Sequence, residues 1–400
     1  MMGKPLRILA LTITDATEGC TFARLITPLE TLKAQGKIEY ELRSFSATRV
    51  TSFRSTLREL PYWDIIWVHR PHHYMALLFI HEAQRLRKPV IVDADDWILD
   101  LPLDAPDAAL VTRSCRETTR LAFRAATVVT VSTQVIADRC AALGVKAHVL
   151  PNAVDCRKFT RDLRCSDNNV LTIAFCGSIS HHDDVQLVVP ALSALLREAS
   201  NRVKVVSVGC PLPEIQGFQG YTHYAQVAAT EYPYLLSRLC IDIGLAPLYD
   251  NAFTRAKSDI KYLEYSATGA ATIASPVVPY TATIHADRGV IVDANTPESW
   301  SFAIRRMIDE QQVRRDVATN AYAWVREERS VAAMADRWYK LFQHYADAYQ
   351  VSEMQYGQRL ASTPSRHSLV NIVLHELPHD AMQVKRVLVQ RTRSRFCKSA

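Results

Sequence analysis

Three charged residues near position 260 have the types and the spacing to bind a phosphorylated ligand. Lys257, Lys261 and Glu264 are four and three positions apart, so a helix over this segment would carry them on one face. The two ammonium groups would balance the charge of a diphosphate, and the carboxylate would accept two hydrogen bonds from a ribose diol. A solvent-facing helix with ion pairs would show the same pattern, and the charges alone leave that alternative open.

A second candidate anion site follows the strand predicted over residues 171–176. There Gly177 and Ser178 form a turn that opens a helix, and backbone N–H groups in such a turn can face an anion. His181 and the aspartates that follow it could suggest a metal site, but no third region supplies ligands. We therefore expect no metal and no cofactor, and we assign His181 to the anion site.

Carboxylates also follow a predicted strand of the first half, over residues 90–92. Carboxylates at a strand end are costly in free energy unless they contact a ligand, a cation or backbone N–H groups. Asp95 and Asp96 are therefore candidates for orienting a hydroxyl group or stabilising a positive charge, and Trp97 could stack on a ring. Capping of a helix N-terminus by either aspartate is the alternative.

Three further candidates stand after strands of the first half. Gly19 follows the strand predicted over residues 7–14 and precedes a helix that carries Arg24. His69 follows the strand predicted over residues 62–68, in a cluster with Arg70, His72 and His73 that could contact an acceptor. An ordinary strand–helix turn at Gly19 and a bystander histidine at position 69 are the alternatives.

The elements that must position these residues alternate between strand and helix patterns in both halves of the chain. Such alternation is typical of an α/β fold with parallel sheets covered on both faces. Ligands of such sheets bind at the carboxyl ends of the strands. We predict two facing Rossmann-like domains with a cleft between them, at 1–150 and 170–350, joined by a linker at 151–169 and followed by a basic tail at 351–400.

The composition supports a globular protein of two domains. Of the 400 residues, 48% are hydrophobic and 22% charged, and no apolar run reaches the ~18–20 residues that span a bilayer. The nine cysteines include no C-x-x-C pair, which argues against a zinc ribbon or a disulfide framework. Walker, G-x-S-x-G and H-E-x-x-H motifs are absent, so ATPase, hydrolase and zinc-protease functions have no residues to support them.

The net charge of +6 comes from the end of the chain, because residues 384–400 include six basic residues and no acid. A basic tail attracts anionic lipid or nucleic acid through salt-sensitive electrostatics. We expect a cytoplasmic protein, either free or peripheral at the inner face of the membrane through this tail, and no nucleic-acid partner. A solvated tail that only keeps the protein soluble is the alternative.

The segment from Lys257 to Glu264, with the strand after it, resembles the retaining GT-B glycosyltransferases of family 4, the glycosyl transferases group 1 type. The resemblance extends over roughly residues 5–345. Members usually carry two glutamates eight positions apart, of which the second matches Glu264 and the first falls on Ala256. The Lys-Ser-x-x-Lys-x-Leu-Glu-Tyr pattern is similar to a subgroup common in polysaccharide and O-antigen assembly, and residues 151–155 resemble the family's hinge segment.

This resemblance implies a metal-independent enzyme that moves a sugar from a nucleoside-diphosphate sugar to an acceptor hydroxyl, with retention. The acceptor would be a glycan, a lipid-linked glycan or another hydroxyl compound. Phosphate contacts would come from Lys257, Ser258 and Lys261, and a ribose contact from Glu264. A His–Asp pair common in the family falls by position on Asp95 and Asp96.

The predicted site has three groups of residues. The catalytic residues are Asp95, Asp96, Lys257 and Lys261. The donor-binding residues are Gly19, Gly177, Ser178, His181, Lys257, Ser258, Lys261 and Glu264. The acceptor-side residues are Arg24, His69 and Trp97. Two other functions remain open: a nucleotide-sugar epimerase of the same fold, and a non-catalytic nucleotide-sugar or glycan-binding subunit, which Ala256 would favour.

Overall fold

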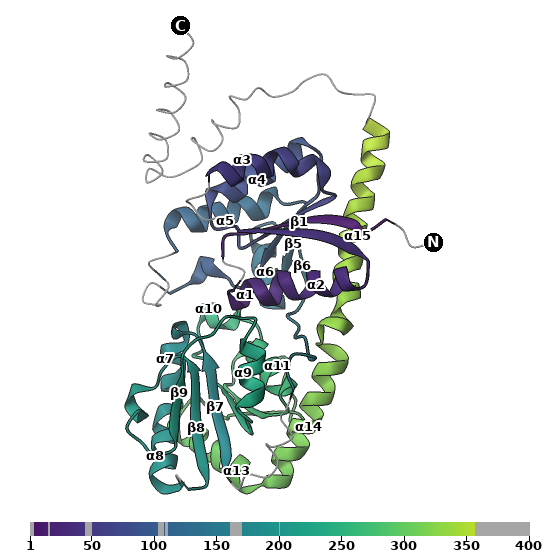
Figure 1. Ribbon diagram of the computed structural model, residues 1–400. Coiled ribbons are helices and arrows are strands. Elements are labelled where there is room, and N and C mark those ends of the chain that lie inside the picture. Colours follow the sequence, from purple (N-terminus) through teal and green to yellow (C-terminus); the bar gives the residue numbers. More distant parts are fainter. Residues whose placement is uncertain are drawn as a thin grey trace.

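The chain folds into two halves, each built around one six-stranded parallel sheet (Figure 1). The computed structural model describes residues 4–14, 17–44, 50–102, 108, 111–160, 170–199 and 201–356. Residues 161–169 of the predicted linker and the predicted tail beyond position 356 lie outside these ranges. Within them, no helix combines the length and the apolar character that crossing a membrane requires.

The first sheet has the strand order β2-β1-β3-β4-β5-β6, and all neighbouring strands are parallel. The strands are β1 (Leu6–Thr12), β2 (Ile38–Ser44), β3 (Ile65–His69), β4 (Val90–Ala94), β5 (Val128–Val131) and β6 (Ala147–Val149). The helices are α1 (Gly19–Thr21), α2 (Thr27–Ala34), α3 (Val50–Glu59), α4 (Tyr74–Arg85), α5 (Arg113–Ala125) and α6 (Gln134–Ala142). A π-helical turn at Phe22–Ile26 joins α1 to α2.

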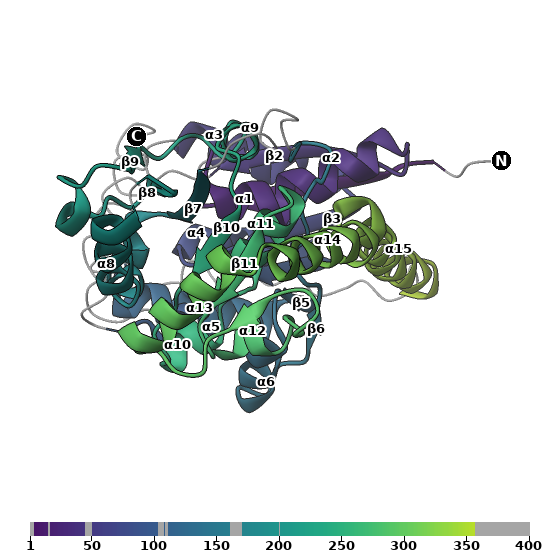
Figure 2. The same ribbon diagram turned by 90° about the horizontal axis from the view of Figure 1, so that it is seen from below.

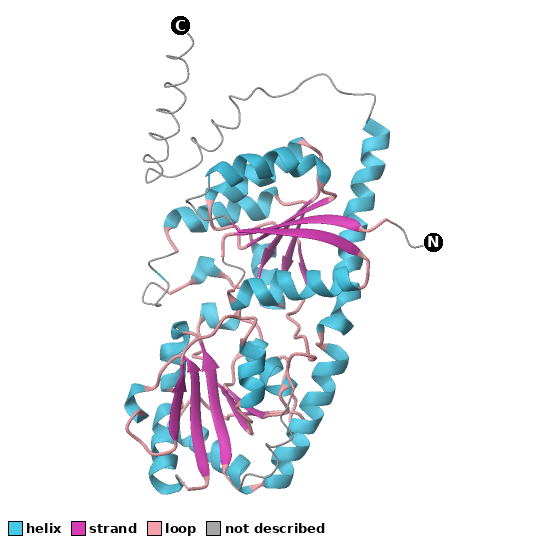
Figure 3. Cartoon of the chain, viewed as in Figure 1, coloured by secondary structure: helices cyan, strands magenta, loops and turns pink. Residues whose placement is uncertain are grey.

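Alternate residues of these strands face two separate hydrophobic clusters. Leu9 and Val68 pack with residues of α4, α5 and α6, whereas Ile8 and Trp67 pack with residues of α2. Because side chains alternate across a strand, burial of both faces requires nearly continuous apolar runs, and the sequences of β3 and β4 have them. Figure 3 shows helices on both sides of this sheet.

The second sheet repeats the plan with the strand order β12-β11-β10-β7-β8-β9, again all parallel. The strands are β7 (Leu171–Gly177), β8 (Val203–Gly209), β9 (Tyr221–Tyr224), β10 (Ile243–Ala246), β11 (Ala271–Ala274) and β12 (Val290–Ile291). The helices are α7 (His182–Gln186), α8 (Val189–Ala199), α9 (Tyr232–Arg238), α10 (Ala252–Arg255), α11 (Ile260–Ala267), α12 (Val278–Thr281), α13 (Pro297–Asp309) and α14 (Gln311–Glu328).

Two helix layers also cover the second sheet. Leu192 of α8 and Met307 of α13 belong to the cluster on one face, and Leu263 of α11 and Val325 of α14 belong to the cluster on the other. Figure 2 shows α8 and α11 on opposite sides of the strands. The predicted α/β class with two Rossmann-like halves is therefore confirmed.

The last described helix, α15 (Val331–Tyr356), returns from the second half to the first (Figure 1). The sequence indicates one helical stretch from 313 to 349, but the structure interrupts it after Glu328. Trp338 and Phe342 of α15 then pack on Trp67 of the first sheet, with ring centroids 4.9 and 5.1 Å apart. The last described helix thus fills the core of the first half and connects the two halves.

The described cysteines include both free thiols and a disulfide-bonded residue. In the described ranges Cys20, Cys115, Cys140, Cys156, Cys176 and Cys210 are free thiols. Cys240 is disulfide-bonded, which the spacing of the cysteines did not predict.

Gly244 of β10 lets the ring of Tyr265 pack directly on the backbone of the second sheet. A Cβ atom at position 244 would lie 2.3 Å from that ring, whose hydroxyl accepts a hydrogen bond from the Cys176 N–H (2.8 Å). We expect Gly244→Ala to lower the free energy of unfolding by about 1–3 kcal/mol, because neither the ring nor the strand can move away cheaply.

Chemical denaturation of Gly244→Ala and of the matched variant Gly217→Ala measures this effect. A Cβ atom at Gly217 meets nothing within 4 Å, so that variant should change stability little. Equal stability of the two variants would contradict the proposed packing role of Gly244.

Candidate active site

A cleft of about 600 Å³ lies between the two halves, at the carboxyl edges of both sheets. The loops after β1, β3 and β4 form one wall, and the ends of β7 and β8 with the start of α11 form the other. The Ala229 N–H donates a hydrogen bond to the Thr17 carbonyl oxygen (3.0 Å) and so connects the halves. The cleft brings together ten of the thirteen predicted site residues: Gly19, Asp95, Asp96, Gly177, Ser178, His181, Lys257, Ser258, Lys261 and Glu264.

The helix expected to carry all three charged residues begins later than the spacing suggests. α10 ends at Arg255 and α11 begins at Ile260, so Lys257 lies in the turn between them. The chain turns there because Ala256 caps α10 and Asp259 occupies the N-cap position of α11. The prediction that the three residues share one helix face was therefore wrong, but Lys257 lines the same cleft as Lys261 and Glu264.

Lys261 is a buried cation beside the end of β7. Its side chain is only 8% exposed, and its Nζ forms no hydrogen bond with any residue in the described part of the chain. A Cβ atom at Gly177 would lie 2.9 Å from this Nζ, so only glycine leaves room for it. Burial lowers the pKa of Lys261. A buried charge without a partner is costly, and an anion in the cleft would remove that cost.

Glu264 lies one turn further along α11 and also lines the cleft. Burial raises its pKa to about 7, although the charge of Lys261 and a hydrogen bond from the Tyr232 hydroxyl (3.3 Å) act in the opposite direction. Tyr232 is a wall residue that the sequence did not single out, because a tyrosine at the start of a helix carries no signal of its own.

His181 belongs to the short 3-10 turn after β7 and is held by Asp184 of α7. Nδ1 of His181 lies 2.8 Å from Oδ2 of Asp184, and Oδ1 of Asp184 accepts a hydrogen bond from the Tyr249 N–H (2.9 Å). Burial and the nearby charge of Lys261 lower the pKa of His181 to about 3. The imidazole is therefore neutral at physiological pH.

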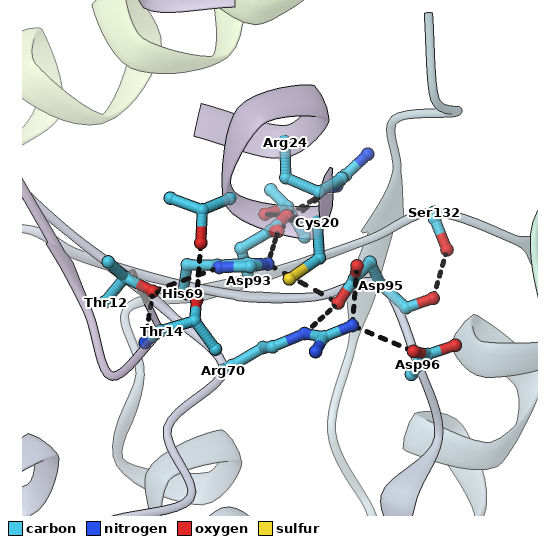
Figure 4. Close-up of polar contacts among 12 residues, drawn as sticks. Thr12, Thr14, Cys20, Arg24, His69, Arg70, Asp93, Asp95, Asp96 and Ser132 are labelled. Carbon is cyan, nitrogen blue, oxygen red and sulfur yellow. Dashed lines mark hydrogen bonds and ion pairs between the residues drawn. The ribbon is translucent and has the colours of Figure 1, made fainter. Parts of the chain in front are cut away.

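On the opposite wall, Arg70 joins the two predicted catalytic aspartates (Figure 4). Its Nε and Nη2 donate to the two carboxylate oxygens of Asp95 (2.7 and 3.0 Å), and Nη2 also donates to Asp96 (2.8 Å). Burial alone would raise the pKa of Asp95, but the charge of Arg70 holds this pKa well below its usual range. Asp95 is thus kept ionised at the wall, Asp96 is held beside it by the same arginine, and neither aspartate caps a helix.

Arg70 belongs to the predicted acceptor-side cluster after β3, but no role of its own was predicted for it from the sequence. It directly follows β3 and has φ = 50°, a left-handed conformation that is uncommon for a residue with a side chain. This conformation accompanies the guanidinium's bridge between Asp95 and Asp96. The position of Arg70 after a buried strand was visible in the sequence, but its backbone angle was not.

The three predicted acceptor-side residues do not line the cleft. His69 is fully buried behind Asp95, with Nε2 3.4 Å from Oδ1 of that residue. Arg24 is 1% exposed and pairs with Asp93, and Trp97 is 5% exposed and stacks on Phe123 with centroids 6.0 Å apart. The structure thus corrects their expected contact with an acceptor, because buried partners from other elements hold all three behind the wall.

The hinge between the halves is built on Asn152, which lies in the segment 151–155 that the sequence indicated as a hinge. Its Oδ1 accepts from Arg24 (3.0 Å), and its Nδ2 donates to the Ser258 hydroxyl (2.8 Å). Its carbonyl oxygen accepts from Arg329 (2.8 Å), which also pairs with Asp259 at the start of α11 (2.8 Å). These contacts link the orientation of the halves to the position of α11.

The cleft can thus hold an elongated ligand with an anionic part at Lys257 and Lys261 and a hydroxyl-bearing part facing Asp95 and Asp96. The charges of the two walls are complementary to such a ligand. In the described residues, no group of three or more His, Cys, Asp or Glu side chains has an arrangement that could hold a metal ion.

Two family models match consecutive parts of the chain. Residues 15–153 match the Glycosyl transferase 4-like domain, and residues 170–310 match the Glycosyl transferases group 1 domain. The two matches coincide with the two sheets and cover both walls of the cleft. No curated protein sequence matches the chain.

Solved structures with the same fold include two bacterial proteins. The HepE protein of Anabaena, solved with UDP and glucose, is 14% identical, has a TM-score of 0.64, and is matched over 85% of this chain and 100% of its own. Sucrose-phosphate synthase of Thermosynechococcus elongatus is 12% identical with a TM-score of 0.67, over 86% and 100% of the chains.

A third similar structure is the α,α-trehalose 6-phosphate synthase of Burkholderia multivorans, at 11% identity and a TM-score of 0.56 over 86% and 100% of the chains. These likenesses confirm the predicted GT-B arrangement of two facing Rossmann-like domains. The two domain matches show that the chain is a glycosyltransferase, with a Glycosyl transferase 4-like domain followed by a Glycosyl transferases group 1 domain.

Proposed function

We propose that the protein transfers a sugar from a nucleoside-diphosphate sugar to an acceptor hydroxyl, with retention of the anomeric configuration and without a metal ion. The observation that carries this proposal is the buried ammonium group of Lys261, which has no hydrogen-bond partner among the described residues and faces the cleft beside Gly177 and opposite Asp95. The HepE structures with UDP and with UDP-glucose support a nucleotide-sugar donor for this fold.

At the donor end, Lys257 and Lys261 stabilise the negative charge that develops on the departing diphosphate. A fixed charge in a site shielded from water needs no reorganisation during the reaction, which makes it more effective than the same charge in solution. Because two ammonium groups already lie there, the leaving group needs no metal ion. We expect the transfer rate to be unchanged when a chelator is added to the purified protein.

At the acceptor end, Asp95 and Asp96 accept a hydrogen bond from the incoming hydroxyl and stabilise the positive charge of an oxocarbenium-like transition state. Hydrogen bonds from Arg70 hold these carboxylates in a fixed position. In a transfer with retention, an oxygen of the departing diphosphate takes the proton of the acceptor hydroxyl. The new glycosidic bond forms as the bond from sugar to phosphate breaks, and no protein base is required.

The test of this function uses purified protein and a panel of UDP-, GDP-, ADP- and dTDP-sugars. A bound donor raises the thermal unfolding temperature by mass action. The donor that binds is then incubated with neutral glycans and with lipid-linked glycans, and NMR gives the anomeric configuration of the product. An inverted product would overturn retention, and donor turnover without any acceptor would instead favour an epimerase.

The acceptor and the cellular role are proposed as a glycan or lipid-linked glycan in polysaccharide assembly in the cytoplasm. The six positive charges of residues 384–400, outside the described part of the chain, would add contact with an anionic membrane. Co-sedimentation with anionic vesicles at low and high salt, with and without residues 384–400, tests this contact. Equal binding by the full chain and the shortened chain would reject it.

Glu264→Gln should weaken donor binding about tenfold, roughly the loss of one charged hydrogen bond. It should also remove a pH dependence of binding. The pKa of Glu264 in the empty protein is about 7, and the ionised carboxylate is the form that accepts two ribose hydrogen bonds. Donor affinity of the wild type should therefore fall as the pH decreases from 8 to 6.

Calorimetric titration at several pH values checks this prediction, because Glu264→Gln should show a weaker but pH-independent affinity over the same range. The empty wild type should show the opposite trend in stability. A pKa raised from 4.5 makes the folded state lose stability as the pH rises toward 7. A wild-type affinity that does not change with pH would argue against ribose binding by Glu264.

A further inference from the structure

His181 and Asp184 form a hydrogen-bonded pair at the second-half wall of the cleft. The proposed function gives this pair no role. His181 lines the cleft beside Lys261, since a Cβ atom at Gly177 would lie 3.2 Å from its Cδ2 and 2.9 Å from the Lys261 Nζ. Asp184 lies behind it, is 6% exposed, and does not line the cleft. The pair therefore presents only the imidazole to a ligand.

The contacts of Asp184 decide which nitrogen of His181 carries the hydrogen. A carboxylate only accepts hydrogen bonds, so Nδ1, at 2.8 Å from Oδ2, is the protonated nitrogen. The other oxygen is occupied by the Tyr249 N–H at 2.9 Å, which fixes the carboxylate in place. In a neutral imidazole the remaining nitrogen, Nε2, is then a hydrogen-bond acceptor.

The surroundings keep this imidazole neutral. The charged groups that face it are Asp184 from α7, Lys261 from α11 and Lys257 from the turn before α11. Burial and the two lysines disfavour a second proton, and together they lower the pKa of His181 to about 3 against the effect of Asp184. In the described part of the chain, no residue donates a hydrogen bond to Nε2.

From this geometry we infer that Nε2 of His181 accepts a hydrogen bond from a hydroxyl of the donor's sugar, with Asp184 as the positioning residue. The oxygens of a diphosphate only accept hydrogen bonds, so they cannot pair with Nε2, which also accepts. The hydroxyl groups of a nucleotide sugar can donate, and they can therefore bind to Nε2. This inference rests on the proposed function and adds a residue that recognises the transferred sugar rather than the nucleotide.

The sugar is a better partner for Nε2 than the ribose because the ribose already has a carboxylate in the proposed site. Glu264 is the single carboxylate among the described second-half residues that line the cleft. It follows Lys261 along α11, whereas His181 approaches Lys261 from the turn after β7. A diphosphate bound at Lys261 would thus have an acceptor group on each side.

The experiment compares the affinities of His181→Ala and the wild type for two pairs of probes by calorimetry: UDP with UDP-glucose, and GDP with GDP-mannose. For the pair that binds, His181→Ala should weaken binding of the nucleotide sugar about tenfold and binding of the nucleoside diphosphate less than twofold. Lys261→Met is the matched control and should weaken both members of the pair. The ratio of the wild-type affinity to the His181→Ala affinity for the nucleotide sugar should stay constant between pH 6 and 8, because Nε2 accepts throughout.

Asp184→Asn provides a second variant that keeps the imidazole. Its amide oxygen can still accept from Tyr249, while its N–H group faces Nδ1 and moves the hydrogen to Nε2. The nucleotide sugar alone should again bind more weakly. If His181→Ala weakens both probes equally or neither, or if the ratio depends on pH as an imidazolium would require, the inference is wrong. If no probe binds the wild type, the proposed donor class itself is rejected, and the inference with it.

Discussion

Lys261→Met should lower the rate of sugar transfer by about 100- to 1000-fold, the cost of removing one fixed charge from a developing anion. Lys261 is the residue with the largest expected effect because its ammonium group is buried in the cleft wall without a hydrogen-bond partner among the described residues. Methionine keeps most of the side-chain volume, so the change removes the charge rather than the packing. Product formation under donor saturation measures the effect.

The thermal stability of the same variant separates a functional role from a structural one. Burial of the charge lowers the pKa of Lys261, which means that the folded protein is destabilised by holding this group ionised. Lys261→Met should therefore unfold at the same temperature as the wild type or higher. Lys146→Ala, at an exposed position of the first half, should leave both rate and stability unchanged. A less stable but fully active Lys261→Met would contradict the assignment.

Asp95→Asn should reduce transfer about 100-fold or more while the affinity for the donor stays within twofold of the wild type. The negative charge of Asp95 lies on the wall opposite the lysines, where it faces the acceptor and the positive charge of the transition state. An amide keeps the shape but loses the charge and one of the two acceptor oxygens that Arg70 contacts. Separate measurement of kcat and of donor affinity checks this split.

The control for Asp95→Asn is Asp64→Asn, which breaks a similar pair. Asp64 lies just before β3, at the opposite edge of the same sheet, and accepts three hydrogen bonds from Arg7: two from its guanidinium (3.4 and 3.1 Å) and one from its backbone N–H (2.9 Å). Both variants should lose some stability, since each leaves an arginine without its full carboxylate partner. Only Asp95→Asn should lose activity per folded molecule. Equal rates for the two variants would show that Asp95 has only a structural role.

The sequence alone was enough to predict most of the strands and helices, though not α3 or β9, and the second-half residues that line the cleft. Strand and helix patterns are local, because they depend on the spacing of apolar residues within a few turns of the chain. The apolar patterns also show where each strand ends, and the residues at or just after those ends include Gly177, Asp95 and Asp96. Ten of the thirteen predicted residues therefore reached the cleft, and the charged segment around Lys261 indicated its ligand class before any contact was known.

Only the tertiary structure decided which polar residues face the ligand and which support the wall. Arg24 is held by Asp93, which is 69 positions away in the sequence, and His69 lies against Asp95, which is 26 positions away. The contacts that build the hinge at Asn152 join residues more than a hundred positions apart. No local pattern encodes such pairs, because the low dielectric that makes them strong exists only once the two sheets have formed and excluded water. The same is true of α15, whose residues complete the core of a sheet that begins at Leu6.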